Sequence, residues 1–270
     1  MNILVALNSN YVSQLTVMLH SMMLSNPKEY FDIYVAHSSL TQRDFRLISD
    51  ATDRHRCRIH PVTVKSDILD EAPVLKRISK ETYYRLLAAE YLPEYLDRIL
   101  YLDPDTVIMN PLDRFYNIDF GDNLIVGATH VALFVKTYNL KRLNMPENGE
   151  YINAGVLLMN LDGLRKSYTS KEIFEYINTN KKKLYLADQD VINALYGDRT
   201  LTIRPELINL DEKTFKRSGK NLAWVEANTM IVHYDGKMKP WKEGYKGVLD
   251  RYYRIIKPEV PVRLTELIGA

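Results

Sequence analysis

Two aspartates separated by one residue, Asp103 and Asp105, directly follow an apolar run, RILYL at 98–102. Carboxylate oxygens suit Mg²⁺ and Mn²⁺, so the pair could hold a divalent cation. In one class of phosphatase, by contrast, the first aspartate of such a pair is itself the nucleophile. A solvated acidic turn is the third possibility. A further Asp-x-Asp, at Asp188 and Asp190, shows that the spacing alone is not specific.

Pro104 makes the segment between the two aspartates stiff, because its ring fixes its own φ and disfavours a helical conformation for Asp103. In an extended stretch, side chains at positions i and i+2 point to the same side. We therefore expect an extended segment from which both carboxylates reach one ion.

A histidine much later in the chain is a candidate third ligand. His233 ends an apolar run and is followed by Gly236, Lys237 and Lys239, which suit the oxygens of a phosphate group. An imidazole beside two carboxylates would favour Mn²⁺ over Mg²⁺, since imidazole is the softer ligand. The competing interpretation is a histidine that forms only structural hydrogen bonds.

Further polar side chains stand at the expected ends of helices and strands. Asp188 is a candidate N-cap, and Gln189 and Asp190 follow in the first turn of the same predicted helix. Asn153 opens an apolar strand, and Arg85 adjoins the apolar face of its helix. Helix cap, strand-end amide and surface arginine are ordinary structural roles for these residues. The functional alternative for Arg85 is a clamp on a diphosphate.

The elements that must position these residues alternate between strand-like and helical patterns in the first half of the chain. The expected strands are 2–7, 31–38, 57–64 and 98–102, and the expected helices are 11–24, 41–52 and 79–92, the last with Ser79 as N-cap. Such alternation predicts an α/β fold with a mostly parallel, twisted sheet flanked by helices. In such sheets ligands bind beyond the carboxyl ends of the strands, which puts residues 8–11 and 103–106 on one rim.

The second half of the chain is less regular. We expect strands at 123–129, 153–161 and 229–236, and a helix at 188–197 closed by Gly197. No linker rich in Pro, Gly or Ser divides the chain. We therefore expect a single domain over residues 1–250, followed by a short C-terminal extension at 251–270.

Composition argues against several classes of protein. The 270 residues carry a formal net charge of only +2, so no overall field marks a nucleic-acid binder. Hydrophobic residues make up 46%, yet no run approaches the ~18 apolar residues of a transmembrane helix. The first residues lack the pattern of a signal peptide. Together with the single Cys57, which suits a reducing compartment, these features favour a soluble, cytoplasmic enzyme.

Six motifs in one order resemble glycosyltransferase family 8, the retaining, metal-dependent enzymes that include bacterial lipopolysaccharide galactosyl- and glucosyltransferases and glycogenin. The motifs are ILVALNSNY, TYYRL, ILYLDPDTVI, NAGVLLMNL, LADQDVIN and HYDGKMKPW, which span residues 3–241. The resemblance implies a Rossmann-like domain of the GT-A type. It also implies Mn²⁺ or Mg²⁺ as cofactor, and a UDP-sugar that donates glucose or galactose.

The resemblance implies roles for individual residues, beginning with the metal and the uridine. The residues that match the family's metal ligands are Asp103, Asp105 and His233. Those that match its uridine-binding loop are Ala6, Asn8, Asn10 and Tyr11. The family usually has an acidic residue where Asn8 stands. An amide oxygen can still accept a hydrogen bond from uracil N3–H, so uridine remains the expected nucleoside.

The other matched positions surround the diphosphate and the sugar of the donor. The residues expected to bind the donor are Arg85, Pro104, Asn153, Gly236 and Lys239. The residues expected near the reacting face of the sugar are Asp188, Gln189 and Asp190. Because the uncharged amide of Gln189 is a poor nucleophile, we expect front-face attack by the acceptor, with Asp190 as the fallback nucleophile.

Two other functions remain open at this point. A haloacid-dehalogenase-type phosphatase would use Asp103 as its nucleophile, and LYLDPDTV fits the opening motif of that family. However, that motif normally begins the fold, and the phosphatase leaves HYDGKMKPW unexplained. The second alternative is a nucleotide-sugar binder that lacks catalytic activity.

The expected acceptor is a hydroxyl group of a glycan or glycolipid. The family often has an acidic residue after LIVGAT, but HVALFV at 130–135 contains none, so the sequence leaves the choice of sugar and acceptor open. Residues 239–257 could make weak peripheral contact with an anionic membrane. The expected location is therefore the cytoplasm, including the inner face of the membrane.

Overall fold

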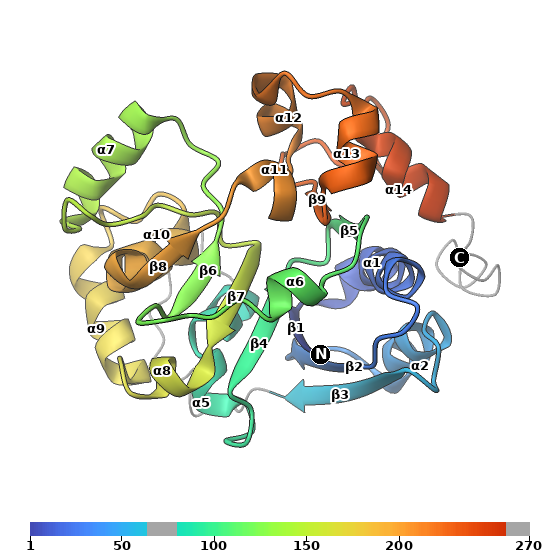
Figure 1. Cartoon of the computed structure of the whole chain (residues 1–270). Coiled ribbons are helices and arrows are strands. Elements are labelled where there is room, and N and C mark those ends of the chain that lie inside the picture. Colours follow the sequence, from blue (N-terminus) through green and yellow to red (C-terminus); the bar gives the residue numbers. More distant parts are fainter. Residues whose placement is uncertain (64–79, 258–270) are drawn as a thin grey trace.

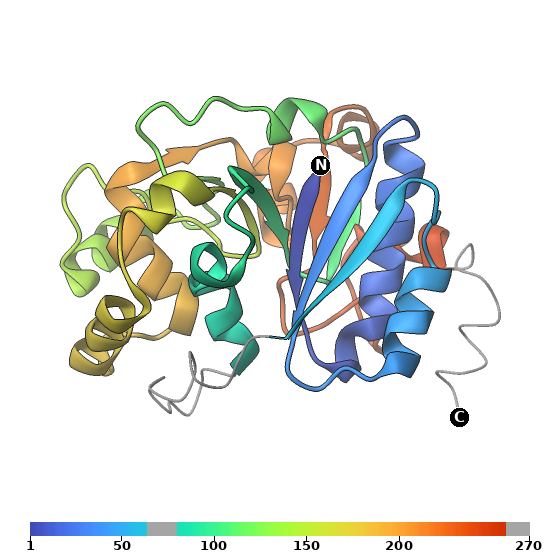
Figure 2. The same ribbon diagram turned by 90° about the horizontal axis from the view of Figure 1, so that it is seen from below.

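A seven-stranded sheet runs through the middle of the molecule, and helices cover both of its faces (Figure 1, Figure 2). The structure is a computed structural model that describes residues 1–63 and 80–257. Across the sheet the strands lie in the order β3-β2-β1-β4-β7-β6-β8. Their bounds are β1 (Asn2–Ala6), β2 (Phe31–His37), β3 (Cys57–Thr63), β4 (Arg98–Leu102), β6 (Ile125–Gly127), β7 (Val156–Asn160) and β8 (Thr200–Thr202).

Most neighbouring strands of this sheet are parallel, as the alternation of strands and helices predicts. Strands β1 to β4 run parallel to one another, and β6 runs parallel to β8. Strand β7 is the exception, because it is antiparallel to both β4 and β6. Strands β1 and β4 are buried on both faces, which explains their unbroken apolar sequences. The predicted α/β fold with a mostly parallel sheet is therefore confirmed.

Two sets of helices fill the two faces of the sheet. One face is covered by α1 (Val12–Ser25), α2 (Gln42–Asp50) and α14 (Asp250–Ile256). The other is covered by α4 (Lys80–Leu86), α5 (Ala88–Tyr91), α8 (Leu161–Arg165), α9 (Ser170–Asn180) and α10 (Ala187–Tyr196). The other helices are η1 (Ser9–Tyr11), α6 (Asp113–Tyr116), α7 (Leu133–Leu143), η2 (Gly197–Arg199), α11 (Pro205–Ile208), α12 (Glu212–Ser218) and α13 (Leu222–Asn228).

The single helix predicted at 79–92 is divided in two. The backbone of Leu87 leaves the helical conformation between α4 and α5. Leu86, Leu87 and Ala88 are all buried, and one amphipathic face cannot bury three consecutive side chains. Packing at the break therefore overrides the helical pattern. The proposed N-cap Ser79 lies outside the described residues.

Helix α10 begins one residue earlier than predicted. Its N-cap is Leu186, so the prediction that Asp188 caps the helix is wrong, and Asp188 lies in the first turn. A carboxylate there still suits the positive end of the helix dipole. Gly197 is the C-cap, as predicted, but with a φ of −62° it has the right-handed helical conformation and not the left-handed one that favours glycine.

A separate two-stranded sheet joins two distant parts of the chain. Strand β5 (Thr106–Ile108) pairs antiparallel with β9 (Ile231–His233), with Thr106 opposite His233. Ser21 of α1 anchors β5, because its Oγ accepts a backbone N–H of that strand at 2.9 Å. This pairing brings the end of β9 beside the turn that follows β4.

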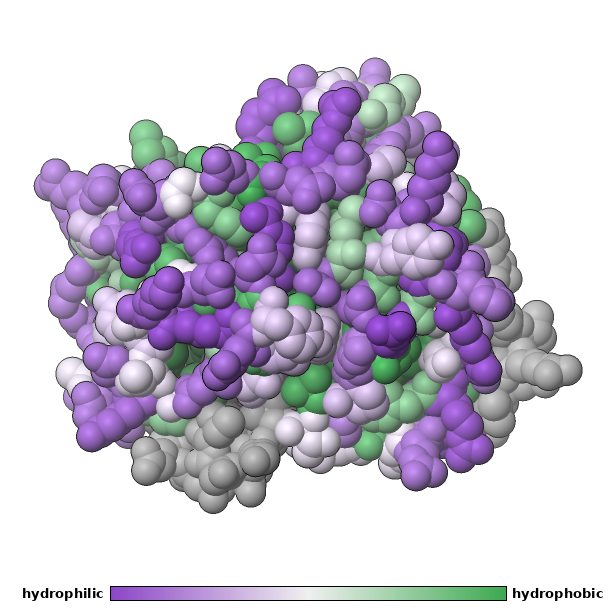
Figure 3. Space-filling model, turned by 60° about the horizontal axis from the view of Figure 1, so that its bottom comes forward, coloured by the Kyte–Doolittle hydropathy of each residue, from purple (hydrophilic) through white to green (hydrophobic). Residues whose placement is uncertain are grey.

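Polar side chains predominate on the face shown in Figure 3, where apolar side chains gather only in small areas. Within residues 1–63 and 80–257, no helix combines the length and the apolar character needed to cross a bilayer. Helix α14 buries Tyr252 and Tyr253, so residues beyond Asp250 contribute to the core.

Candidate active site

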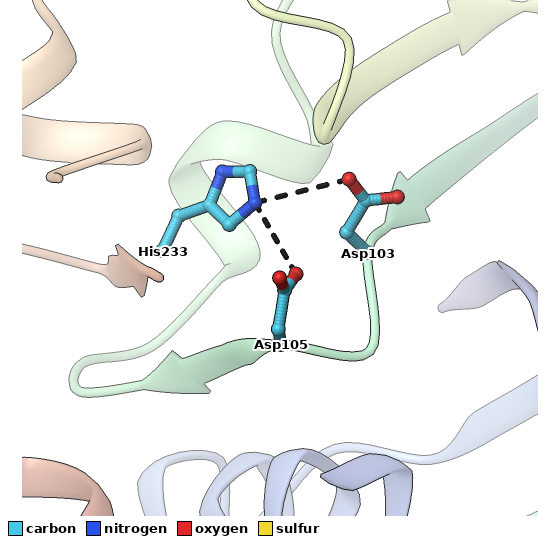
Figure 4. A group of neighbouring side chains, drawn as sticks. All are labelled: Asp103, Asp105 and His233. Atoms are coloured by element: carbon cyan, nitrogen blue, oxygen red, sulfur yellow. Dashed lines mark ion pairs between the residues drawn. The ribbon is translucent and has the colours of Figure 1, made fainter. Parts of the chain in front are cut away.

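Two aspartates and one histidine converge where β4 and β9 end (Figure 4). His233 Nε2 lies 3.3 Å from Asp105 Oδ1 and 3.8 Å from Asp103 Oδ2. One potential ligand atom from each residue lies within 4.8 Å of the others. Asp105 and His233 are buried, whereas Asp103 is partly exposed. The fold therefore brings together the three residues that the sequence suggests as cation ligands.

The two carboxylates meet through a turn, and the prediction of an extended segment is wrong. Pro104 and Asp105 form the turn between β4 and β5, and Pro104 is buried within it. Thr106 Oγ1 donates to the backbone C=O of Asp103 at 3.0 Å and closes the turn. The φ of a proline fits both an extended segment and the second position of a turn, so its presence does not distinguish the two.

Gly155, in the loop before β7, preserves the space between the histidine and the aspartates. Its C=O accepts the backbone N–H of Asp103 at 2.8 Å. A Cβ atom at this position would clash with the ring of His233 and would lie 2.7 Å from Asp103 Oδ2. The missing side chain keeps open the space next to the Asp103 carboxylate and the His233 imidazole. The residues present therefore fit a bound divalent cation.

Arg85 links the aspartates to helix α10. Its Nη1 lies 3.1 Å from Asp103 Oδ1 and 2.7 Å from the C=O of Ala154. Its Nε lies 2.7 Å from Asp188 Oδ2, as an ion pair without the alignment of a hydrogen bond. Burial alone would lower the pKa of Arg85, but Asp103 and Asp188 raise it, so the guanidinium stays charged. The interpretation of Arg85 as a surface residue is wrong.

Tyr101, which the motifs do not assign a role, completes this network. Its hydroxyl donates to Asp103 Oδ1 at 2.6 Å, and the guanidinium of Arg85 lies 4.6 Å from the centre of its ring. Burial raises the pKa of Asp188, and the charge of Arg85 opposes that shift. One arginine thus bridges the carboxylates of Asp103 and Asp188 and offsets the repulsion between them.

Lys239 reaches the aspartates from the turn that follows β9. Its Nζ donates to Asp105 Oδ2 and to the C=O of Tyr234, each at 2.6 Å. Burial alone would raise the pKa of Asp105, but the charges of His233 and Lys239 hold it well below its usual value. Gly236, from the same turn, lines a second cavity, and His233 contributes to the lining of both this cavity and the one that contains the two aspartates.

Gln189 and Asn153 lie side by side in the same site. Gln189 Oε1 accepts from the backbone N–H of Ala154 at 3.3 Å and from Asn153 Nδ2 at 3.5 Å. Gln189 Nε2 donates to the hydroxyl of Tyr151 at 3.4 Å. The two side chains therefore present polar, uncharged atoms to a ligand.

Asp190 is a structural residue. Its side chain is fully buried and accepts from both terminal nitrogens of Arg142, at 2.8 and 2.9 Å, and from the hydroxyl of Tyr151 at 2.6 Å. The backbone N–H groups of Tyr185 and Leu186 also donate to it. Because both oxygens are occupied and Asp190 is not among the residues that line the cavity, the role of fallback nucleophile does not fit this residue.

The loop after β1 contacts the segment that follows β9, through Tyr11 and Trp241. At the carboxyl end of β1 lie the residues predicted to bind uridine, Ala6, Asn8, Asn10 and Tyr11. Asn8 caps η1, since its Oδ1 accepts the backbone N–H of Asn10 at 3.1 Å. The oxygen proposed to contact uracil therefore already has one partner. The ring of Tyr11 lies edge-on to that of Trp241, with centroids 6.4 Å apart.

An open cavity of about 530 Å³ collects most of the predicted residues. Those that line it are Arg85, Asp103, Asp105, Asn153, Asp188, Gln189, His233 and Lys239. Those outside its lining are Ala6, Asn8, Asn10, Tyr11, Pro104, Asp190 and Gly236. The cavity combines carboxylates for a cation, basic groups for phosphate oxygens and amides for hydroxyl groups.

The sequence reasoning missed His130, which also lines this cavity. His130 Nε2 donates to the C=O of Asn209 at 2.6 Å, and its Nδ1 lies 3.2 Å from Asp235 Oδ2. Its ring centroid lies 6.4 Å from that of His233. Asp235 falls inside the motif HYDGKMKPW and could have been considered, whereas Asn209 belongs to none of the six motifs.

The sheet, with Asp103 just after β4 and His233 at the end of β9, belongs to a glycosyltransferase fold of the GT-A type. The sequence profile of glycosyl transferase family 8 matches residues 2–244, and the chain belongs to this family. The predicted resemblance is therefore confirmed. This family assignment also argues against the phosphatase alternative, because the apolar strand followed by Asp-x-Asp is explained by the transferase family.

Curated relatives and a solved structure agree with this assignment. Lipopolysaccharide 1,2-glucosyltransferase of Escherichia coli K12 is 26% identical over 97% of this chain and 78% of its own length. Lipopolysaccharide 1,3-galactosyltransferase of Salmonella typhimurium LT2 is 22% identical over 96% of this chain and 78% of its own. The crystal structure of galactosyltransferase LgtC with donor and acceptor sugar analogs superposes with a TM-score of 0.83, at 23% identity and 96% coverage of both chains.

Proposed function

We propose that the protein is a metal-dependent, retaining hexosyltransferase. It moves glucose or galactose from a UDP-sugar to a hydroxyl group of a glycan or glycolipid. The observation that carries the proposal is the convergence of Asp103, Asp105 and His233 in one cavity with Arg85 and Lys239. The lipopolysaccharide glucosyl- and galactosyltransferase activities in the names of its relatives support the sugar and the class of acceptor.

Asp103, Asp105 and His233 are the residues that would hold the cation, which the chemistry of their donor atoms suits. A bound divalent cation neutralises charge on a diphosphate and makes it a better leaving group. Arg85 is paired with Asp103 and therefore keeps one ligand in place. Since oxygen and imidazole ligands are mixed, Mn²⁺ is the expected ion and Mg²⁺ the alternative.

The turn after β9 provides the basic groups for the leaving diphosphate. Lys239 is already at the site through its contact with Asp105, and an ammonium group there can stabilise the charge that develops on a phosphate oxygen. Gly236 lines the adjoining cavity, to which His233 also contributes. The uridine is expected beside Tyr11, where the loop at 8–11 meets Trp241.

Near Gln189 the structure favours attack by the acceptor on the same face as the leaving group. Gln189 is uncharged, Asp188 is paired with Arg85, and Asp190 is buried with its oxygens occupied. A covalent intermediate on one of these side chains would require its present contacts to break. We therefore propose that the leaving phosphate removes the proton of the acceptor hydroxyl while Gln189 positions the sugar.

A donor panel tests the proposal directly. UDP-glucose, UDP-galactose and other nucleotide sugars are incubated with the protein, with Mn²⁺ or with a chelator, and release of UDP is measured. Metal-dependent consumption of one UDP-hexose is the expected result, and the variant Asp103→Ala should lose it. Binding of a UDP-sugar without any turnover would identify the inactive binder instead.

A further inference from the structure

A buried asparagine outside the six motifs, Asn209, contacts the ring nitrogen of His233 that faces away from the aspartates. Its side chain is fully buried. Its Oδ1 lies 3.0 Å from His233 Nδ1, and its Nδ2 lies 3.1 Å from Asn153 Oδ1. Both ends of the amide therefore have a partner inside the protein.

A backbone amide decides which end of each side chain is the oxygen. The N–H of Gly155 donates to the side chain of Asn153 at 2.9 Å, and a backbone N–H can only donate, so the contacted atom is an oxygen. The same oxygen lies 3.1 Å from Asn209, which must therefore present its NH₂ group. The other end of the Asn209 amide is then an oxygen, which can only accept.

The orientation of the Asn209 amide determines which ring nitrogen of His233 carries a hydrogen. Because an acceptor faces Nδ1, the hydrogen of the neutral imidazole must be at Nδ1. In the neutral form that a metal ligand requires, Nε2 then carries the lone pair, and this is the nitrogen that faces Asp103 and Asp105. In the charged form, which lowers the pKa of Asp105, the proton to be lost on metal binding is the one on Nε2. A histidine that binds a metal usually donates its other N–H to a fixed acceptor in this way.

The backbone of Asn209 is fixed relative to the strand that carries His233. The N–H of Asn209 donates to the C=O of Pro205 at 3.0 Å. Leu210, the next residue, donates to the C=O of Ile231 at 2.9 Å and accepts the N–H of His233 at 2.8 Å. The segment therefore runs beside β9, and the amide cannot shift along it without breaking these bonds.

We propose that Asn209 is a positioning residue, which holds His233 in the tautomer and orientation that direct Nε2 toward Asp103 and Asp105. The inference rests on the proposed role of those three residues as cation ligands. It adds a residue outside the motifs, and gives Asn153 a second role as the group that orients the amide of Asn209.

The test is a titration of the full chain with Mn²⁺ alone, followed by electron paramagnetic resonance. Asn209→Leu removes both hydrogen bonds at similar volume, and its affinity for Mn²⁺ should fall about 10- to 100-fold. Asn209→Asp keeps the acceptor for His233 Nδ1–H, so it should lose less affinity than the leucine variant. The nitrogen hyperfine coupling of the bound ion should be present in the parent protein and weakened in Asn209→Leu.

The matched control is Asn26→Leu. Asn26 is also buried, accepts the backbone N–H of Leu112 at 2.8 Å and donates to the C=O of Met22 at 2.9 Å. Its loss should lower the melting temperature and leave the affinity for Mn²⁺ unchanged.

Two kinds of failure are distinguishable. If Asn209→Leu is folded by circular dichroism and binds Mn²⁺ with the affinity and nitrogen coupling of the parent, the positioning role is wrong. Should the leucine variant fail to fold, an affinity of Asn209→Asp below that of a His233→Ala variant would overturn it equally. If the parent binds no Mn²⁺, or if His233→Ala binds it as tightly, the proposed cation site fails, and the inference fails with it.

Discussion

The ammonium group of Lys239 lies 2.6 Å from Oδ2 of Asp105, so one side chain joins the expected phosphate site to the expected cation site. The same nitrogen donates to the C=O of Tyr234, which fixes the turn after β9. The positive charges of Lys239 and His233 keep the pKa of the buried Asp105 low. Asp105 is therefore ionised near neutral pH, as a ligand of a divalent cation must be.

Replacement of Lys239 by methionine should separate cation binding from turnover. Without the ammonium group, Asp105 loses a positive neighbour, so the affinity for Mn²⁺ in the absence of donor should rise. Transfer from the UDP-sugar should fall about 10²–10³-fold, the usual effect of losing one stabilising donor at a developing charge. Titration with Mn²⁺ and a turnover assay measure the two effects. The control is Lys242→Met, at an exposed lysine, which should change neither the affinity for Mn²⁺ nor the rate of transfer.

Gly155→Ala should abolish cation binding while the fold persists. The added methyl group would meet the His233 ring and the Asp103 carboxylate, so these side chains would have to move apart. Gly163→Ala is a suitable control, because its methyl group would lie 2.6 Å from Leu124 Cδ2 in the hydrophobic core and would contact no residue of the site. Both changes should cost about 1–3 kcal/mol of stability. Only Gly155→Ala should lose Mn²⁺ binding, and equal affinities in the two variants would argue against the proposed site.

Loss of the Asp190 carboxylate should affect stability first. Asp190→Ala leaves the buried guanidinium of Arg142 without its partner, which should cost about 3–5 kcal/mol in urea unfolding at neutral pH. Burial alone would raise the pKa of Asp190, but Arg142 and Tyr151 lower it. Its contribution is therefore present above the unfolded pKa of about 3.9 and is lost as the pH falls through the lower, folded value.

The neutral variant Asp190→Asn tests both the stability and the catalytic interpretation. Its unfolding free energy should depend less on pH below about pH 4 than that of the parent. Samples that remain folded should retain measurable transfer, because Asp190 contacts no ligand in the proposed mechanism. Complete loss of transfer in a folded Asp190→Asn sample would restore this residue as a candidate nucleophile.

A bound cation should stabilise the whole protein. At a concentration 100 times its dissociation constant, a ligand of the folded state adds about 2.7 kcal/mol, which for a chain of this size is a rise of about 5–10 °C in melting temperature. Differential scanning calorimetry with a chelator and then with excess Mn²⁺ measures this rise. His233→Ala should show little or none, and an undiminished rise in that variant would place the ion elsewhere.

The first half of the fold could be predicted because its strands are parallel and alternate with helices. Strands β1 and β4 appear in the sequence as continuous apolar runs between helical patterns. In the second half the predicted strands at 123–129, 153–161 and 229–236 contain β6, β7 and β9 but are longer than these strands, and the three-residue strands β5 and β8 have no counterpart in the prediction. Such short strands depend on pairing with distant neighbours, which local patterns do not contain.

The site could be predicted only where its chemistry lies within short motifs. Asp103 and Asp105 follow the apolar strand β4 and His233 ends the apolar strand β9, and residues at such strand ends lie on one rim of the sheet. The buried ion pair of Asp190 could not be predicted, because its partner Arg142 lies on α7, far away in the sequence. Asn209 acts through one atom of His233 and one of Asn153, a relation that exists only in the folded chain.

The pairing of β5 with β9 makes the site depend on the order in which the chain is synthesised. Asp105 is added when more than half of the 270 residues are still to be made, whereas His233 and Lys239 lie in the last part of the chain that the structure describes. A nascent or proteolytically shortened chain that ends before β9 would contain both aspartates, the loop at 8–11 and most of the sheet. It would still be unable to complete the cation site. Activity therefore requires that synthesis and folding have reached β9, the last strand among the described residues.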